Sequence, residues 1–486
     1  MSSRPGPYDL LVIGGGVNGA SIARAAAVAG RSVLLVEQGD LAQATSSAST
    51  KLMHGGLRYL EYYEFKLVGE ALKERAIMLR MAPHLVRPLE FRLPHAAGTR
   101  PWWMVRLGLW IYDLLALGGG LPASRGVRLD DPAMRDHGGR GFSYWDGWVD
   151  DARLVALNAV DAREAGAEIR TRTRLMSAER GPQLWTARLE DAAGPRVVTA
   201  RTMINAAGPW VARVLRDELA IEGGSKVRLV RGSHLILSRR LAGDHAWLLQ
   251  QPDGRVVFAI PYLDDFTLVG TTDIPVDRPE DAAISRDEVN YLLGAVNLYL
   301  REPVAADEIV SAYAGVRPLF DDGAGDASAV TRDYRLELDT DGAPLLSVFG
   351  GKITTARHLA AAALERLGIS GGDTRRRPLP GGDIDDFEAF QDEVARRWPF
   401  LEAATARRLA RAYGTRVGQV LGEARDHAGL GADFGAGLTA REIDYLMDAE
   451  WARDAEDVLW RRSKLGVRLT ATQVAAVQTY IDGRTA

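Results

Sequence analysis

The sequence predicts an α/β (α+β) fold with three parts: a Rossmann-like dinucleotide-binding domain, an antiparallel-sheet domain and a C-terminal all-α domain. Three patterns support this. Residues 8–36 form a β-α-β pattern, residues 229–272 contain short apolar runs separated by turn signals, and residues 385–486 have a helical pattern without a clear strand. A chain of 486 residues also suggests about three domains, at roughly 150 residues each.

The composition is that of a folded globular protein and excludes several kinds of site. Hydrophobic residues make up 47% and charged residues 26% of the chain, which excludes extensive disorder. The net charge of -4 argues against a dedicated nucleic-acid-binding protein. The absence of cysteine excludes disulfides, iron–sulfur clusters, a catalytic thiol and a flavin attached through sulfur. Neither an 18-residue apolar run nor a secretory signal is present, so we expect a protein of the reducing cytoplasm.

The N-terminal β-α-β unit consists of two apolar runs around an alanine-rich segment. Residues 8–13 (YDLLVI) predict a buried parallel strand, and residues 32–36 (SVLLV) predict a second one. Residues 18–30 contain no proline and end in glycine, which is typical of a helix and its stop signal. The helix would thus connect two neighbouring parallel strands.

A G-x-G-x-x-G motif lies between the first strand and the helix. Gly14 would permit the tight turn, Gly16 would let the backbone approach a pyrophosphate, and Gly19 would let the helix pack closely on the strand. Glu37 follows Gly14 by 23 residues, close to the spacing of about 20 expected for a carboxylate that binds ribose. These features predict a dinucleotide site. The acid favours FAD or NAD over NADP, because it would repel a ribose phosphate.

A hydroxyl-rich loop and a double glycine follow this unit. Taken alone, residues 45–51 (TSSASTK) would be a helix cap or a solvated turn. They lead directly into residues 52–59, where paired glycines stand beside His54, Arg58 and Tyr59. This combination suggests backbone that passes close to a flat ring, with polar side chains directed over it, and so favours FAD.

At this point the sequence resembles a known family. Residues 44–68 (ATSSASTKLMHGGLRYLEYYEFKLV) resemble the signature of the FAD-dependent glycerol-3-phosphate dehydrogenases of the aerobic, quinone-reducing type. The likeness continues in MAPHLVRPLEFRLPH, GWVDDARLV, INAAGPWV, RGSHLI, GTTDI, GVRPL, TRDY, LLSVFGGKITT and AEDVLWRRSKLG, and so spans nearly the whole chain. It implies a D-amino-acid-oxidase-like flavoprotein fold and non-covalently bound FAD. It also implies oxidation of sn-glycerol 3-phosphate to dihydroxyacetone phosphate, by hydride transfer from C2 to FAD N5, with electrons passed to ubiquinone or another membrane quinone.

Combined with the element pattern, the resemblance implies a division into domains. The FAD-binding domain would be discontinuous, formed by residues 8–80, 146–228 and 310–370. A substrate or cap domain would comprise residues 81–145 and 229–309. A glycine- and proline-rich linker at 371–384 would connect these domains to the C-terminal helical domain at 385–486.

The resemblance also implies the catalytic residues. His54 and His234 are both candidates to accept the hydroxyl proton, since an imidazole with a pKa near 6.5 suits this step, and the sequence does not choose between them. Arg317 is the candidate for polarising the alcohol or the developing ketone.

The phosphate of such a substrate requires fixed cations. Arg58, Arg332 and Lys352, together with Tyr59, match family motifs and are the substrate-binding candidates. Most arginines are solvated surface groups, so these are distinguished by their motif context alone. Lys352 is one of only six lysines and follows a double glycine.

Four motifs contribute candidate cofactor contacts besides Glu37: the glycine motif, the loop at 45–56, and the turns at 205–210 and 350–354, which match the family's flavin-contact turns. The candidates are Gly14, Gly16, Asn18, Gly19, Glu37, Thr45, Ser46, Lys51, His54, Gly55, Gly56, Ala207, Gly208, Trp210, Gly351, Lys352 and Thr354. We expect no metal site, because the eight histidines show no H-x-H or H-x-x-x-H spacing.

Residues 101–117 (PWWMVRLGLWIYDLLAL) form an apolar, tryptophan-rich segment that is too short and too interrupted by charge to cross a bilayer. It would be a core helix, a dimer contact or a membrane-facing interfacial helix. A quinone acceptor favours the last, and with it a peripheral location on the cytoplasmic side of the inner membrane. We further expect a homodimer and no nucleic-acid partner.

Other functions stay open at this stage. A glycerol-3-phosphate oxidase would share fold and site but pass electrons to oxygen. An amine-oxidising flavoenzyme would need fewer cations than this chain offers. A flavin-binding interaction protein, such as an RNA-associated one, would draw on the many arginines, although the acidic residues balance them.

Overall fold

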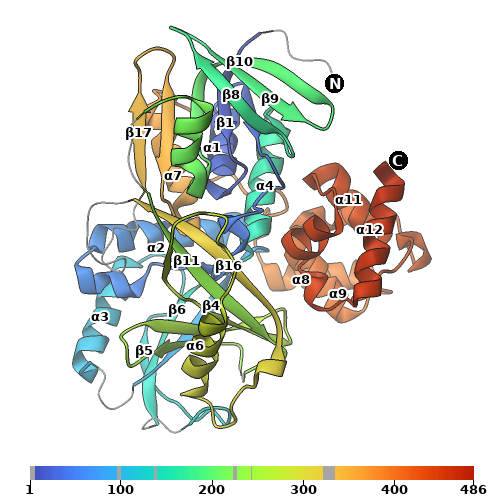
Figure 1. Cartoon of the computed structure of the whole chain (residues 1–486). Helices are drawn as coiled ribbons and strands as arrows, with labels where there is room; N and C mark the ends of the chain where they lie inside the picture. The colour runs from blue at the N-terminus through green and yellow to red at the C-terminus, as the bar shows by residue number, and fades with distance from the viewer. Residues whose placement is uncertain are drawn as a thin grey trace.

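The computed structural model describes residues 6–95, 100–135, 139–222, 227–241, 243–320 and 334–485. Two β-sheets form the main body, and a group of helices lies beside it (Figure 1). Mixed α/β architecture with a C-terminal helical domain confirms the predicted fold class.

The first sheet contains the N-terminal strands. Its order is β17-β18-β10-β1-β2-β7, with β8 and β9 continuing from β10. Its strands are β1 (Tyr8–Ile13), β2 (Val33–Val36), β7 (Glu168–Arg170), β8 (Arg174–Arg180), β9 (Trp185–Asp191), β10 (Gly194–Asn205), β17 (Arg335–Asp339) and β18 (Leu345–Phe349). β2, β1, β10 and β18 run parallel, as the apolar runs at 8–13 and 32–36 predicted. Parallel strands covered on both faces are apolar throughout, which explains these runs.

Three helices cover one face of this sheet. They are α1 (Val17–Val28), α4 (Asp151–Glu164) and α7 (Ala356–Arg366). Alanines dominate their contacts, so α1 packs closely against both α4 and α7 in a core shared with β1 and β2. The alanine-rich composition of residues 18–30 is therefore a packing requirement.

The second sheet is mainly antiparallel. Its order is β15-β11-β14-β13-β12-β4-β6-β3, with β16 paired to β11 and β5 to β6. Its strands are β3 (Leu52–Met53), β4 (Val86–Pro94), β5 (Arg125–Arg128), β6 (Arg140–Val149), β11 (Val227–Leu237), β12 (Ala246–Gln250), β13 (Val256–Tyr262), β14 (Phe266–Gly270), β15 (Ile274–Val276) and β16 (Ile309–Phe320). β11 to β14 confirm the antiparallel strands predicted within residues 229–272.

The sheet pairing departs from the expected domain boundaries in two places. Residues 310–320 were expected in the FAD-binding domain, but β16 pairs with β11 along its length in the second sheet. β6 begins at Arg140 and continues past the expected boundary at residue 146. The residue pattern of an apolar strand does not indicate which sheet the strand joins, so the sequence alone could not assign these two strands to a sheet.

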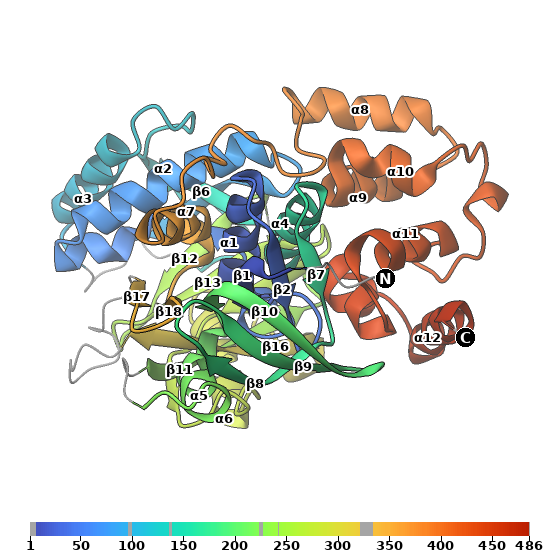
Figure 2. The same ribbon diagram turned by 90° about the horizontal axis from the view of Figure 1, so that it is seen from above.

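Four further helices flank the sheets. They are α2 (Phe65–Met81), α3 (Trp102–Leu115), α5 (Val211–Arg213) and α6 (Arg286–Asn297). α3 lies at the periphery of the molecule beside α2 (Figures 1 and 2). No helix in the described ranges is both long and apolar enough to cross a bilayer.

The C-terminal region is helical, as the sequence predicted. It contains α8 (Phe387–Arg397), α9 (Ala403–Tyr413), α10 (Val417–Leu421), α11 (Ala440–Glu450) and α12 (Ala471–Thr485). These helices surround a hydrophobic core of their own and lie to one side of the sheets (Figure 2).

We predict that Gly19→Ala destabilises the protein. An added Cβ would lie 1.9 Å from the carbonyl oxygen of Gly14, so α1 would have to move away from the end of β1. Overpacking of this kind costs about 1–3 kcal/mol of unfolding free energy. Urea denaturation followed by circular dichroism measures the change.

Gly294→Ala is the matched control, because Gly294 is an exposed position of α6 and a Cβ there meets no atom within 4 Å. Removing a helical glycine stabilises by about 0.5–1 kcal/mol. Equal stability of the two variants would contradict the close packing of α1 on β1.

Candidate active site

A cavity of about 1110 Å³ contacts both sheets. It exceeds the usual range of about 300–1000 Å³ for small-molecule pockets and suits an extended ligand such as a dinucleotide. Its lining comes from segments far apart in the sequence: residues 13–18, 36–48, 173–175, 206–214, 311–318, 350–351 and 456–464.

The glycine motif forms one wall of this cavity. Gly14 has a φ of +108°, and a Cβ there would lie 2.6 Å from the carbonyl oxygen of Ala206. A Cβ on Gly16 would lie 3.2 Å from the Oγ of Ser46, which accepts a 3.0 Å hydrogen bond from the amide of Val17. The N-terminus of α1 thus opens toward Ser46, a position that suits an anionic pyrophosphate.

Glu37 lies at the end of β2 and also lines the cavity. Its two carboxylate oxygens accept hydrogen bonds from the amides of Gly15 at 2.7 Å and Gly39 at 2.8 Å. Burial raises the pKa of this carboxyl, and the amide hydrogen bonds oppose that effect. The carboxylate is therefore held rigidly beside the glycine motif, where a ribose would lie in a Rossmann-type site.

The hydroxyl-rich loop contacts β16 and α4. The Oγ1 of Thr45 donates to the carbonyl oxygen of Val316 at 2.6 Å. The Nζ of Lys51 lies 2.9 Å from both carboxylate oxygens of Asp151 and donates to the carbonyl oxygen of Ser47 at 3.0 Å. Burial lowers the pKa of Lys51, although Asp151 opposes the shift. Lys51 therefore connects the hydroxyl-rich loop to Asp151 at the start of α4.

His234 lies on β11, fully buried. Its Nε2 is 2.9 Å from the Oγ1 of Thr50, and its ring stacks on Tyr313 with a centroid separation of 4.8 Å. Burial, followed by the positive charges of Arg317 and Lys51, lowers its pKa well below the ordinary value. The imidazole is consequently neutral at physiological pH.

Arg317 lies on β16, opposite Val230 of β11. Its guanidinium forms an ion pair with Asp273 and donates to the Oγ1 of Thr271 at 2.9 Å. A Cβ on Gly232 would lie 2.3 Å from its Nη2, so the side chain crosses β11 at a glycine. His234 and Arg317 therefore occupy the same region of two paired strands.

The remaining motif turns come together on the other side of the loop. The amide of Gly55 donates to the Oη of Tyr112 at 2.9 Å. The Nζ of Lys352 lies 4.1 Å from the centre of the Tyr59 ring, a cation–π contact. The first contact joins the turn at 54–59 to α3, and the second joins it to the turn at 350–354.

Asn18 links this region to the glycine motif, because its Nδ2 donates to the carbonyl oxygen of Gly350 at 3.1 Å. Gly351 has a φ of +103°, and a Cβ there would lie 2.8 Å from the Asn18 amide. Position 351 therefore requires glycine, which alone tolerates both the positive φ and the close approach.

The structure separates the sequence-predicted residues into two groups. Those that line the cavity are Gly14, Gly16, Asn18, Glu37, Thr45, Ser46, Lys51, Ala207, Gly208, Trp210 and Gly351. Those outside its lining are Gly19, His54, Gly55, Gly56, Arg58, Tyr59, His234, Arg317, Lys352 and Thr354. Arg332 lies outside the described residues.

Several lining residues had been given no role from the sequence. They are Tyr262, Tyr313, Gly315 and Val316 from the second sheet, and Glu456, Trp460, Arg461 and Lys464 from the C-terminal region. The family motifs GVRPL and AEDVLWRRSKLG contain six of these eight residues and could have pointed to them. Within the described ranges, no group of three or more acidic or histidine side chains is arranged to hold a metal ion.

The fold and the cavity together define an FAD-dependent oxidoreductase. The family described as "FAD dependent oxidoreductase" matches residues 9–357, and the "C-terminal domain of alpha-glycerophosphate oxidase" matches residues 372–482. The chain is 50% identical to a glycerol-3-phosphate dehydrogenase of Pseudomonas aeruginosa, over 98% of this chain and 95% of the relative. It is 46% identical to an aerobic glycerol-3-phosphate dehydrogenase of Escherichia coli, over 97% of each chain. The protein therefore belongs to the glycerol-3-phosphate dehydrogenase group of the FAD-dependent oxidoreductase family.

Two further similarities bear on substrate and fold. A D-erythritol 1-phosphate dehydrogenase of Brucella abortus is 48% identical over 99% of each chain. The solved glycerol-3-phosphate dehydrogenase of Bacillus halodurans, complexed with FAD, has a TM-score of 0.74 and 26% identity, covering 98% of this chain and 94% of that one. These findings confirm the family resemblance seen in the sequence and FAD as the cofactor.

We predict that the buried, neutral His234 makes stability depend on pH. Below about pH 6.5 the unfolded chain binds a proton at this residue that the folded protein does not, so the free energy of unfolding falls as the pH drops. Between pH 6 and pH 5 this single group removes about 1 kcal/mol. Urea denaturation of wild type and His234→Gln at each pH measures the difference.

The variant should lose less stability than wild type over that interval, whereas the two proteins should change in parallel above pH 7.5. Parallel behaviour down to pH 5 would mean that His234 carries a proton in the folded state.

Proposed function

We propose that the protein oxidises sn-glycerol 3-phosphate to dihydroxyacetone phosphate and passes the electrons to a membrane quinone. The observation that carries this proposal is the position of a buried, neutral imidazole, His234, and of the guanidinium of Arg317 on two paired strands, β11 and β16, whose residues Ile236 and Val316 line the cavity. Bound FAD supplies the acceptor for the hydride that leaves C2 of the substrate. The names of relatives at 46–50% identity support the same substrate.

The chain's own residues would hold the substrate and move its proton. His234 or His54 would take the proton from the C2 hydroxyl. Arg317 would stabilise negative charge as it develops on that oxygen. Arg58, Arg332 and Lys352 would bind the phosphate, with Tyr59 fixing the Lys352 ammonium through the cation–π contact.

The cofactor candidates would hold FAD along the cavity. The amides at the start of α1, beside Ser46, would receive the pyrophosphate, and Glu37 would bind the ribose. The turns at 206–208 and 350–351 would pass close to the flavin ring, since both line the cavity with small residues. The candidates outside the cavity lining would support the segments that carry these lining residues.

The outer face of α3 supports a membrane-bound acceptor. Its exposed large apolar residues recur at helical spacing along one face, whereas Leu109 and Tyr112 face the core. The residues along this face are Trp103, Leu107, Trp110 and Leu114 of α3, followed by Leu117 just beyond the helix. An apolar stripe of this kind, rich in tryptophan, suits a helix that lies in the headgroup region of a bilayer.

We therefore place the protein peripherally on the cytoplasmic side of the inner membrane, with α3 as its contact, so that a lipid-soluble quinone reaches the flavin. A homodimer is part of the same proposal, on the family resemblance alone.

D-Erythritol 1-phosphate is a second candidate substrate, because a dehydrogenase of that name is 48% identical to this chain over almost its whole length. Both substrates carry a phosphate on a primary carbon and a secondary alcohol beside it. The same cations and the same histidine would serve either one, so the choice depends on the room available for the longer carbon chain.

We predict that anaerobic addition of sn-glycerol 3-phosphate to the FAD-loaded protein bleaches the flavin absorbance. Hydride transfer reduces the flavin, and without oxygen or quinone it stays reduced. Stopped-flow absorbance gives the rate, and the same experiment with D-erythritol 1-phosphate compares the two substrates. The substrate with the larger kcat/KM in a quinone-analogue assay is the physiological one, and peroxide release instead of quinone reduction would identify an oxidase.

Arg317→Ala is the diagnostic variant for this experiment. We expect it to slow bleaching by about 10²–10³-fold, the usual effect of removing one group that stabilises a developing oxyanion, while FAD stays bound. Bleaching at the wild-type rate would show that Arg317 does not act on the substrate. An unchanged flavin spectrum with every phosphorylated polyol would refute the proposed function itself.

We predict that Trp110→Glu weakens binding to lipid vesicles. A charge in the middle of the exposed α3 stripe opposes its insertion among the headgroups. Co-sedimentation with vesicles made from phosphatidylethanolamine and phosphatidylglycerol measures the bound fraction, and we expect at least a tenfold loss of affinity.

Leu298→Glu is the control, because Leu298 is similarly exposed but follows α6 in the second sheet's domain. It should bind vesicles like wild type. Equal binding by the Trp110→Glu variant would show that α3 is not the membrane contact.

A further inference from the structure

The C-terminal domain reaches the FAD cavity through one short segment. Residues 454–464 lie between α11 and α12 and include the helix η9 (Asp457–Arg462). Glu456, Trp460, Arg461 and Lys464 of this segment line the cavity, as do Glu37, Gly39 and Gln43. The cavity is therefore lined by two parts of the chain that lie more than 400 residues apart in the sequence.

Asp40 is the main link between these two sides. It belongs to the loop that begins with Glu37, and its side chain is fully buried. The Nε of Arg461 donates to one of its oxygens at 2.6 Å, and the guanidinium of Arg462 contacts both oxygens at 2.8 and 2.9 Å. Neighbours of Asp40 in this loop, Gly39 and Gln43, line the cavity themselves.

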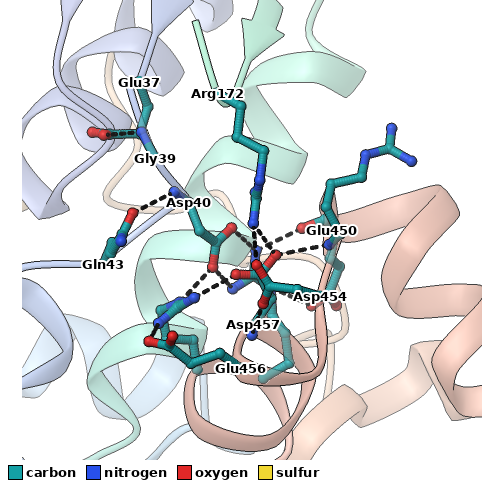
Figure 3. Close-up of polar contacts among 12 residues, drawn as sticks. Glu37, Gly39, Asp40, Gln43, Arg172, Glu450, Asp454, Glu456 and Asp457 are labelled. Atoms are coloured by element: carbon teal, nitrogen blue, oxygen red, sulfur yellow. Dashed lines mark hydrogen bonds and ion pairs between the residues drawn. The ribbon is translucent and has the colours of Figure 1, made fainter. Parts of the chain in front are cut away.

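Arg172 adds a second connection from the same side. Its Nη2 contacts Asp454 at 2.8 Å and Asp457 at 2.7 Å, while its backbone amide donates to the carbonyl oxygen of Gly39. Figure 3 shows Asp40 and Arg172 pointing from the Rossmann side toward Asp454 and Asp457 of the C-terminal segment. We call Asp40, Arg172, Asp454, Asp457, Arg461 and Arg462 the junction cluster.

A third connection reaches the hydroxyl-rich loop. Lys464 pairs with Asp150 and lies 3.8 Å from Asp151, the carboxylate that also holds Lys51. Both loops that frame the cavity, 37–43 and 45–51, are thus connected to residues 454–464 through buried charges.

Arg461 has a protein partner at each nitrogen of its guanidinium. Its Nε, Nη1 and Nη2 donate to Asp40, Glu456 and Asp457 respectively. Its effect on the cofactor is to fix the position of loop 37–43, and with it the carboxylate of Glu37. Arg461 and Asp40 are therefore positioning residues.

We propose that docking of the C-terminal domain and binding of FAD are coupled through the junction cluster, so that each increases the stability of the other. This inference rests on the proposed FAD site, in which the cofactor would contact loop 37–43 in the arrangement that the cluster holds. Coupling of this kind is reciprocal by thermodynamic necessity. Buried ion pairs suit this task, because removal of one partner leaves the other charged and unpaired in the interior.

The test compares FAD retention by holoproteins with single substitutions in the cluster. Arg461→Met keeps the side-chain volume and removes the charge, and Asp40→Asn removes its partner. We expect each to weaken FAD binding at least tenfold, as measured by the fluorescence of free FAD released on dilution. In the double variant the second substitution should add less than threefold, because the pair acts as a unit.

Arg416→Met is the matched control. Arg416 also joins the C-terminal domain to the main body, through an ion pair with Glu164 at the end of α4, but neither residue lines the cavity. FAD affinity should stay within twofold of wild type in this variant. Circular dichroism confirms that each variant is folded, and Arg461→Lys serves as the milder substitution if the methionine variant is not.

A second readout measures the reverse effect. Limited proteolysis within the linker at 371–384 reports separation of the C-terminal domain. Addition of FAD should slow this cleavage in wild type and in the Arg416→Met protein but not in the Arg461→Met protein. FAD affinity within twofold of wild type in both cluster variants, or an equal loss in the control, would overturn the proposal. The cluster would then be a structural contact without influence on the cofactor.

Discussion

Two carboxylates at the start of α4, the buried Asp151 and the partly buried Asp150, are the constraint on which the site depends. Asp150 and Asp151 pair with Lys51 from the hydroxyl-rich loop and with Lys464 from the C-terminal segment. Neither lysine is exposed, so each ammonium depends on these carboxylates for its charge compensation. Asp150 also caps α4 by accepting a hydrogen bond from the amide of Arg153. The start of α4 thus sets the position of the hydroxyl-rich loop relative to the C-terminal segment that contains Lys464, and all three lie around the cofactor cavity.

Electrostatics divides the site into two regions with different tasks. Around His234 the nearby cations are paired, Arg317 with Asp273 and Lys51 with Asp151, and the imidazole is buried and neutral. Such a region suits proton transfer and the stabilisation of a partial charge more than the binding of a dianion. In the proposed function the phosphate would bind at the turns around Lys352, whose ammonium lies 4.1 Å from the centre of the Tyr59 ring. The division agrees with a substrate whose alcohol and phosphate lie on different carbons.

Local patterns predicted those parts of the structure that local forces determine. The β-α-β unit, the glycine turn and the strands of residues 229–272 follow from periodicity and turn residues, and the structure contains them. Residues 310–320 were assigned to the FAD-binding domain, and β16 pairs with β11 in the second sheet, a long-range pairing that its apolar sequence does not encode. Lys51 was expected as a cofactor contact and does line the cavity, but its ammonium is directed to Asp151, a partner 100 residues away. The cavity-lining role of Arg461 depends on docking between domains, which no local pattern reveals.

The loop between Glu37 and Gln43 depends on the C-terminal domain for its charge balance. It bears a buried aspartate, Asp40, that would be unpaired without Arg461 and Arg462. A buried, unpaired carboxylate is costly, so this chain could not lose its C-terminal domain without rearranging the loop that supports the ribose site. In the coupling proposed above, the C-terminal domain holds the cofactor site in its binding arrangement before FAD binds, which lowers the entropic cost of binding.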